Sequence, residues 1–178
     1  MELSTPRLIL RPWTQSDAPD LFGLASDPAI GLSAGWKPHE TVEESAAIID
    51  TLFSKPLVFA IVSRTSNRPV GCVELIRNPQ ILRSGPNDLE LGYWIGRRHW
   101  NQGFATEASK EVIRYAFEEE GVQNIWCQFV EGNPQSARVQ EKCGFKYHHR
   151  GVFSNPFLGE VVTVVSLLSK KDWKKANS

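Results

Sequence analysis

The sequence predicts an α/β fold in which strands and helices alternate within one domain. A chain of 178 residues is short enough for a single domain to be the default. Apolar residues recur at strand spacing in some segments and at helical spacing in others. Near the middle, a strand-like segment from Leu89 to Ile95 leads through a glycine-containing turn into a long amphipathic segment. We expect the order β-α-α-β-β-β-α-β-α-β-β in one domain over residues 1–178, with its core at about 5–173.

The first half of the chain is expected to hold two helices and three strands. Asp27-Pro28 is expected to end the first helix, and Gly31 to Pro38 to form a loop that carries Trp36. Thr41 and Glu44 have the spacing of a capping box, which predicts a helix start. The expected elements are a strand from Arg7 to Arg11, a helix from Thr14 to Ala25, a helix from Thr41 to the Lys55-Pro56 pair, and strands from Leu57 to Ser63 and from Val70 to Arg77.

The second half is expected to hold two helices and four strands, the last two of which pair to close the sheet. The longer helix carries Ala108, Val112, Tyr115 and Ala116 at helical spacing on its inward face. The expected elements are strands from Leu89 to Ile95 and Asn124 to Val130, helices from Thr106 to Glu120 and Pro134 to Lys142, and closing strands from Phe145 to Gly151 and Val161 to Leu168.

The turn Trp100-Asn101-Gln102-Gly103-Phe104-Ala105-Thr106 is the first candidate binding site. The first N–H groups of a helix have no intrahelical partner, and the helix dipole adds positive charge there. Gly103 would let the backbone approach an anion closely. A Walker loop and a G-x-G-x-x-G dinucleotide motif are both absent. The turn therefore suggests a pyrophosphate site for a nucleotide or for coenzyme A, and the alternative is a plain strand-to-helix turn.

A second motif runs from Asn133 to Phe145 and follows the strand that ends at Val130. Asn133 suits the N-cap of a short helix, Pro134 its first position, and Gly144 the position after its end. The pattern N-x-x-S-x-x-x-x-x-x-x-G-F, one strand after G-x-A-T-E-A, resembles the GCN5-related N-acetyltransferases (GNAT). The motif R-L-I-L-R-P-W near the start of the chain and the motif E-L-G-Y-W-I-G that begins at Glu90 resemble the RimJ/RimL-type branch of that family. The resemblance covers nearly the whole chain.

The resemblance implies a mixed sheet that splays beside acetyl-CoA, which serves as co-substrate. It implies that the backbone of Trp94 and Ile95 pairs with the pantetheine arm and that Asn133 contacts the same arm. The turn would hold the pyrophosphate through the backbone amides of Asn101, Gln102, Gly103, Phe104, Ala105 and Thr106, with a further bond from the Thr106 hydroxyl.

Acetyl transfer to an amine requires a base for the amine and a proton donor for the leaving thiolate. Glu90 is the candidate base, because the family often carries a carboxylate on the strand before Leu91; the alternative is a structural glutamate. The tyrosine that many members use as the acid is replaced here by Gln140. Ser136 matches the serine of RimJ/RimL-type enzymes, so it is the candidate acid and a cofactor contact. Its alternative is a hydroxyl bonded to the helix backbone.

Trp36 and Glu160 are the candidate contacts to the acceptor amine. Trp36 lies in the segment that lines the acceptor pocket in the family. Glu160 lies on the segment after the Gly-Phe pair, where some members carry a base, although a solvated turn residue is the alternative. The three cysteines form no C-x-x-C pair, so we expect no zinc site and no other metal.

Charge and composition restrict the partners. Lys plus Arg and Asp plus Glu number 20 each, which gives no support to a nucleic-acid partner. No apolar run reaches the length of a membrane helix, and no signal peptide is evident, so we expect a cytoplasmic protein. The family resemblance implies a monomer or homodimer. The expected activity is direct acetyl transfer in a ternary complex to a protein N-terminus or a small-molecule amine. The alternative is a non-catalytic acetyl-CoA sensor.

Overall fold

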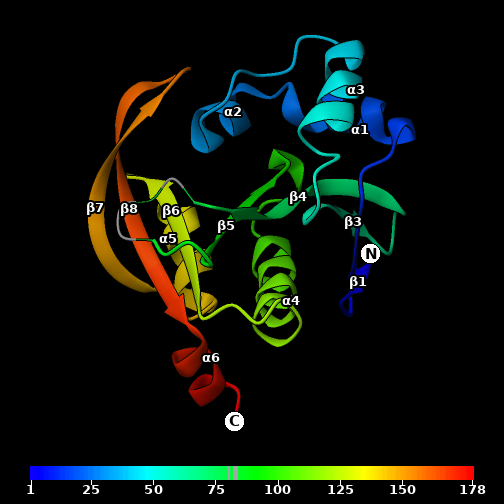
Figure 1. The fold of residues 1–178 in the computed structure, drawn as a ribbon. Coiled ribbons are helices and arrows are strands. Elements are labelled where there is room, and N and C mark those ends of the chain that lie inside the picture. The colour runs from blue at the N-terminus through cyan, green and yellow to red at the C-terminus, as the bar shows by residue number, and fades with distance from the viewer. Residues whose placement is uncertain (80, 82–83) are drawn as a thin grey trace.

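A computed structural model describes residues 1–79, 81 and 84–178. In this part of the chain, eight strands form one mixed sheet in the order β1-β2-β3-β4-β5-β6-β8-β7 (Figure 1). The strands are β1 Leu3–Ser4, β2 Leu8–Arg11, β3 Val58–Ser63, β4 Arg68–Arg77, β5 Leu89–Ile95, β6 Asn124–Val130, β7 Lys146–Asn155 and β8 Gly159–Ser169. The helices are α1 Ala18–Ala25, α2 Pro28–Ala34, α3 Val42–Thr51, α4 Phe104–Glu118, α5 Pro134–Lys142 and α6 Lys170–Ala176, with 3-10 turns at Gln15–Asp17 and Arg97–His99.

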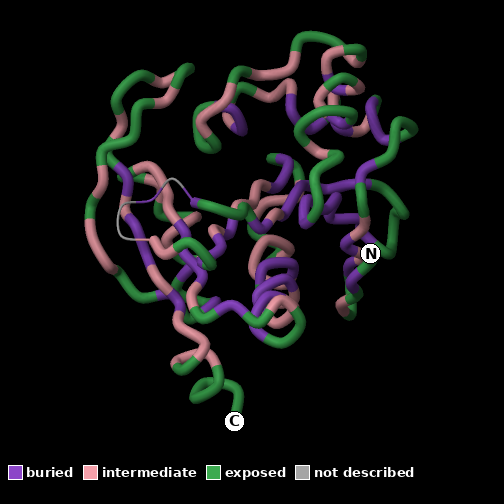
Figure 2. Tube along the Cα trace, viewed as in Figure 1, coloured by how far each residue is buried: buried purple, intermediate pink, exposed green. Residues whose placement is uncertain are grey.

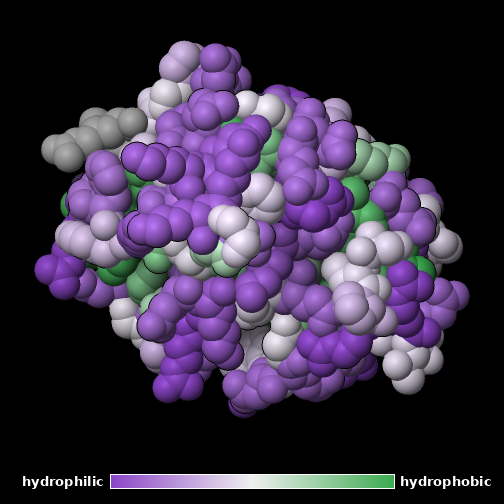
Figure 3. Space-filling view, turned by 90° about the horizontal axis from the view of Figure 1, so that it is seen from below, coloured by the Kyte–Doolittle hydropathy of each residue, from purple (hydrophilic) through white to green (hydrophobic). Residues whose placement is uncertain are grey.

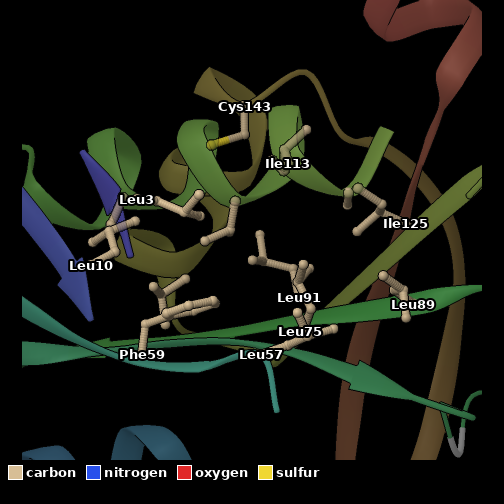
Figure 4. Close-up of a cluster of buried hydrophobic side chains, with 14 of the residues drawn as sticks. Leu3, Leu10, Leu57, Phe59, Leu75, Leu89, Leu91, Ile113, Ile125 and Cys143 are labelled. Carbon is tan, nitrogen blue, oxygen red and sulfur yellow. The ribbon is translucent and has the colours of Figure 1, made fainter. Parts of the chain in front are cut away.

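The sheet has helices on both faces, and each face has its own core (Figures 1 and 2). One face packs on α4, and Figure 4 shows Leu75 and Leu91 pointing toward Ile113 of that helix. The opposite face carries Val58, Ala60, Val62 and Cys72 and packs on α1 and α3. All six residues of β3 are buried, because helices cover this strand on both sides.

The sheet opens between β5 and β6, which are its parallel pair. The two strands pair only at Leu89 with Ile125 and at Glu90 with Trp126. Beyond this point β5 remains paired with β4 as far as Ile95, while β6 remains paired with β8 as far as Val130. The later part of β5 therefore presents a strand edge to the space between the two halves of the sheet.

The predicted α/β class and the pairing of the last two strands are confirmed. The N-terminal segment differs from the prediction: α1 ends at Ala25 as expected, but Asp27-Pro28 also begins a further helix, α2, which was not expected. The Asp27 carboxylate accepts a hydrogen bond from Ala29 N at 2.9 Å, Pro28 occupies the first turn, and Gly35 ends α2 at φ 81°. Half of the expected loop from Gly31 to Pro38 is thus helical, and Trp36 follows the C-cap Gly35.

Other boundaries differ by smaller amounts. The segment from Thr14 to Ala25 divides into a 3-10 turn and α1, because Pro19 is accommodated only in a first helical turn. The helix expected to reach Lys55 ends at Thr51, and α4 begins at Phe104 instead of Thr106. The short strand β1 and the C-terminal α6, which is capped by the Ser169 side chain, were not expected.

The surface seen from below in Figure 3 is largely hydrophilic, with small apolar patches separated by polar side chains. Within the described ranges, no helix combines the length and the apolar composition needed to cross a bilayer.

Candidate active site

Two cavities meet at the opening between β5 and β6. The α4-side cavity has a volume of about 620 Å³ and lies against α4 and α5. The α3-side cavity has a volume of about 630 Å³ and lies against α3 and the strands β4 to β8. Each has the size of a small-molecule site. Six residues line both cavities and form what we call the junction: Ser33, Ala34, Tyr93, Trp94, Val130 and Ser136.

The first turn of α4 forms one end of the α4-side cavity. Gly103 is the N-cap at φ 79° and supplies no side chain to cap the helix, and Asn101 before it also has a positive φ of 61°. Asn101 and the segment from Gly103 to Thr106 line the cavity. Gln102, expected to contribute its backbone amide, does not line the cavity; its side-chain Nε2 donates to Arg98 O at 3.3 Å. The first N–H groups of a helix have no intrahelical partner, so they can donate hydrogen bonds to an anion.

Arg7 of the N-terminal segment contacts Glu107 and Gln102 and holds this turn, and we call these contacts the brace. The sequence analysis did not find it. Arg7 Nε lies 2.6 Å from Glu107 Oε2, and Arg7 Nη1 donates to Gln102 O at 2.9 Å. The Arg7 guanidinium also lies 4.9 Å from the centre of the Phe104 ring. Burial raises the pKa of Glu107, but hydrogen bonds from Thr5 and Arg7 outweigh it and lower the pKa. Arg7 therefore compensates the negative charge of Glu107 in the turn that would receive an anion.

Trp94 and Ile95 line the α4-side cavity at the edge of β5 that β6 leaves unpaired. Asn133 lines the same cavity from the other side, and its Oδ1 accepts from Ser136 N at 3.1 Å. This bond confirms Asn133 as the N-cap of α5. The arrangement leaves a slot between an open strand edge and the start of a helix, and an extended amide-containing chain could pair with that edge.

Ser136 lies at the junction. Its backbone N–H is used in the cap, and within the described part of the chain its hydroxyl interacts with the side chain of Tyr93 instead of with the helix backbone. The alternative of a hydroxyl bonded to the helix backbone thus finds no support there. Tyr93, to which the sequence analysis gave no role, donates from its hydroxyl to Ser136 O at 3.1 Å. Burial raises the pKa of Tyr93, so the phenol stays neutral and ties β5 to the start of α5.

Glu90 lines the α3-side cavity and accepts from Gln128 Nε2 at 3.0 Å. Burial raises the pKa of Glu90, the Gln128 bond opposes that shift, and the charge of Glu74 adds to it. Glu74 of β4 lines the same cavity, and burial raises its pKa as well. The sequence analysis missed Glu74, although a charged residue among the otherwise buried positions from Val70 to Leu75 was an available signal.

The two candidate acceptor contacts have different surroundings. Trp36 lines the α3-side cavity, and its ring centre lies 5.7 Å from that of Trp94 at an edge-on angle of 69°. Glu160 is exposed on β8 opposite Ser154 and lines neither cavity. The structure thus brings Glu90, Trp36, Trp94 and Ser136 together and leaves Glu160 outside this group.

Comparisons with known proteins agree with this fold. A family model described as "Acetyltransferase (GNAT) domain" matches residues 7–146. The uncharacterized N-acetyltransferase YoaA of Bacillus subtilis is 29% identical over 149 residues, which cover 81% of this chain and 82% of that protein.

Solved structures match over almost the whole chain. An acetyltransferase of the GNAT family from Bacillus anthracis superposes with a TM-score of 0.80 at 20% identity, covering 96% of this chain and 99% of that one. Spermidine N-acetyltransferase from Vibrio cholerae, in complex with CoA and spermine, superposes with a TM-score of 0.76 at 20% identity, with coverage of 96% and 99%.

An open strand edge, a helix start without a side-chain cap and a partly buried carboxylate lie at one opening in a mixed sheet, and this fold is that of the acetyltransferases it matches. The chain belongs to the GNAT family and is an N-acetyltransferase, an enzyme that transfers an acetyl group to an amine.

Proposed function

We propose that acetyl-CoA occupies the α4-side cavity and that the acceptor amine occupies the α3-side cavity. The observation that carries this proposal is the junction, where Tyr93, Trp94 and Ser136 line both cavities at once. The pyrophosphate would bind the first turn of α4, and the pantetheine arm would pair with β5 at Trp94 and Ile95. Asn133 would contact the same arm. The thioester then lies at the junction, within reach of an amine from the other side.

Glu90 is the proposed base. At pH 7 an α-amino group with a pKa near 8 costs about 1.4 kcal/mol to deprotonate, and a lysine-type amine costs over about 4 kcal/mol. A carboxylate whose pKa is raised by burial is better matched to this transfer than an exposed one. The neutral amine would attack the thioester carbon, and backbone N–H groups of β5 near Trp94 would stabilise the oxyanion. Collapse breaks the C–S bond, and the Ser136 hydroxyl would donate the proton to sulfur.

Direct transfer in a ternary complex is supported by the state of the cysteines. Burial raises the pKa of Cys143 to about 12 and that of Cys127 well above its usual value. A thiol that stays protonated is a poor nucleophile, so an acetyl-cysteine intermediate has no support.

The acceptor remains one of two classes, a protein N-terminus or a small-molecule amine. We further propose a single N-acetyltransferase domain over residues 1–178, acting in the cytoplasm as a monomer or homodimer. The second candidate function is a non-catalytic acetyl-CoA sensor, which Gln140 in place of the usual tyrosine favours. The hydroxyls of Tyr93 and Ser136 at the junction favour the enzyme.

The test is coenzyme A release from acetyl-CoA with a panel of N-terminal peptides, polyamines, amino acids and aminoglycosides, with each product identified by mass. We expect a mass increase of one acetyl group on members of one class. Acetyl-CoA binding without acetylation of any amine would support the sensor instead, and absence of acetyl-CoA binding would contradict both functions.

A further inference from the structure

Glu74 lines the α3-side cavity, in space that the backbone of β5 leaves open at Gly92. Glu74 pairs across the sheet with Gly92. A Cβ added at Gly92 would lie 2.9 Å from Glu74 Oε1 and 3.0 Å from its Cγ. A side chain at position 92 would therefore displace the Glu74 carboxylate, and the glycine leaves open the space in which that carboxylate lies across β5.

Glu74 and Glu90 share one face of the sheet. Residues that pair directly across two strands lie on the same face, and so do residues two apart on one strand. Glu74 faces Gly92, and Glu90 lies two residues before Gly92 on β5. The two carboxylates are therefore diagonal neighbours, at a spacing where one small group could contact both. The electrostatic effect of Glu74 on the pKa of Glu90 agrees with this placement.

No cation of the described chain pairs directly with either carboxylate. Lys55 attracts Glu74 without forming an ion pair, and Lys37 is paired with Glu40 at 2.7 Å. His39 binds Ser45 at 2.8 Å, and burial lowers the pKa of His39. Other titratable side chains that line the cavity are those of Glu44, Tyr93 and Cys127, and Cys72 adjoins Glu74 on β4; none of these supplies a positive charge.

A partly buried pair of carboxylates without a directly paired cation is costly, and a positively charged ligand would reduce that cost. Trp36, Phe53, Trp94 and Phe153 line the same cavity, and aromatic faces also favour cations. A carboxylate on the ligand beside its amine would instead meet Glu74 at close range, which is unfavourable.

We propose that Glu74 and Glu90 together bind the acceptor as an ammonium group, and that Glu74 selects primary amines with no carboxylate next to the amine. This inference rests on the proposed function. The N–H bond of the ammonium breaks, and its proton passes to the Glu90 carboxylate while Glu74 stays charged and holds the nitrogen. The C–N bond then forms, and collapse of the oxyanion breaks the C–S bond. Ser136 gives its proton to sulfur, and the second amine proton passes to Ser136 and restores its hydroxyl. Glu90 returns its proton to water. Glu74 is thus a specificity and positioning residue.

The test compares matched amine pairs that differ only in the carboxylate: glycinamide with glycine, leucinamide with leucine, and phenylalaninamide with phenylalanine. Wild type, Glu74→Gln and the exposed control Glu43→Gln are assayed at one pH. We expect wild type and the control to prefer each amide. In Glu74→Gln, KM for the amides should rise, and the preference of kcat/KM for amide over acid should fall about tenfold. Because all three proteins are assayed with the same two amines, the difference in amine basicity cancels when the proteins are compared.

The pH profile supplies a readout that a structural role would not change. The charge of Glu74 raises the pKa of Glu90. Removing the Glu74 charge in Glu74→Gln should therefore lower the pKa of Glu90 and shift the acidic limb of kcat/KM for a good amide to lower pH. An unchanged amide preference together with an unchanged limb would overturn the proposal.

Tryptophan fluorescence provides a second measurement that needs no turnover, because Trp36 and Trp94 both line the cavity. Wild type should bind the amides more tightly than the acids, and Glu74→Gln should lose that difference. Equal binding of amide and acid by wild type would overturn the inference. Clear discrimination in binding with no acetylated product would instead count against the proposed function alone.

Discussion

Glu90 combines burial, a single amide partner and an acidic neighbour. All three bear on its pKa: burial raises it most, the Gln128 amide lowers it, and Glu74 raises it. A base must be ionised to act, so activity should rise with pH as Glu90 loses its proton, at a pH above the ordinary glutamate value.

Replacing Glu90 with Gln should lower kcat/KM by roughly a hundredfold or more, since general-base catalysis typically contributes 10²–10⁴. The acidic limb due to Glu90 should disappear, and the remaining rate should follow ionisation of the amine itself. Initial rates from pH 6 to 9 check this, and circular dichroism confirms the fold. Full turnover across that range would remove Glu90 from the mechanism.

Ser136 can be tested without disturbing the helix cap, because its backbone N–H makes the bond to Asn133. We expect Ser136→Ala to lower kcat while leaving acetyl-CoA affinity within about twofold, since a lone hydroxyl makes a small contribution to binding. The exposed Ser16→Ala serves as the control. A wild-type kcat would assign the proton donor elsewhere, and Tyr93 is another side chain with a hydroxyl at the junction.

Local patterns predicted the residues whose roles depend on neighbours in sequence. Asn133 and Pro134 mark a helix start by chemistry alone, and Glu90 is marked by the motif around it. Glu74 could not be found this way, because its role depends on lying opposite Gly92, and register is a property of the folded sheet. Arg7 and Glu107 are 100 residues apart, so nothing local links them.

Among the elements, α2 shows how one local signal can have two meanings. An Asp-Pro pair can follow the end of one helix or begin the next, and here it begins α2. The error affects the site, since α2 supplies Ser33 and Ala34 to the junction.

The contact of Arg7, just before β2, with Glu107 of α4 joins two elements. Arg7 carries a half-exposed side chain, at 51%, whereas that of Glu107 is 17% exposed. Arg7→Ala would leave the Glu107 carboxylate uncompensated beside the anion site. Charges at a helix start contribute about 0.3–1 kcal/mol, so acetyl-CoA affinity should fall roughly two- to fivefold.

The double variant Arg7→Ala with Glu107→Gln removes both charges and should recover most of that affinity. Calorimetric titration of acetyl-CoA at low and high salt measures the effect, which should shrink as salt increases. A double variant that binds as weakly as the single one would mean that the brace acts through backbone position instead of charge.

In the whole molecule, the sheet consists of two halves that separate along β5 and β6. The strands β1 to β5 and the strands β6 to β8 are each continuously paired, and they join only at the start of the parallel pair. This opening brings together the first turn of α4, which follows β5, and the capped start of α5, which follows β6. The element order was predictable from the chain except for β1, α2 and α6, but the volumes and the shared walls of the two cavities depend on packing across the entire fold.

The central claim is that acetyl-CoA binds with its pyrophosphate at the first turn of α4. Gly103 allows a test by charge alone, because Asn and Asp both tolerate its positive φ better than other side chains and have nearly the same shape. Asp at an N-cap also favours the helix, so Gly103→Asp should not unfold it. The most direct measurement is calorimetric titration of acetyl-CoA into wild type, Gly103→Asn and Gly103→Asp. We predict that Gly103→Asp binds at least about tenfold more weakly than Gly103→Asn, because its carboxylate repels the pyrophosphate. Equal affinity for all three proteins would contradict the account.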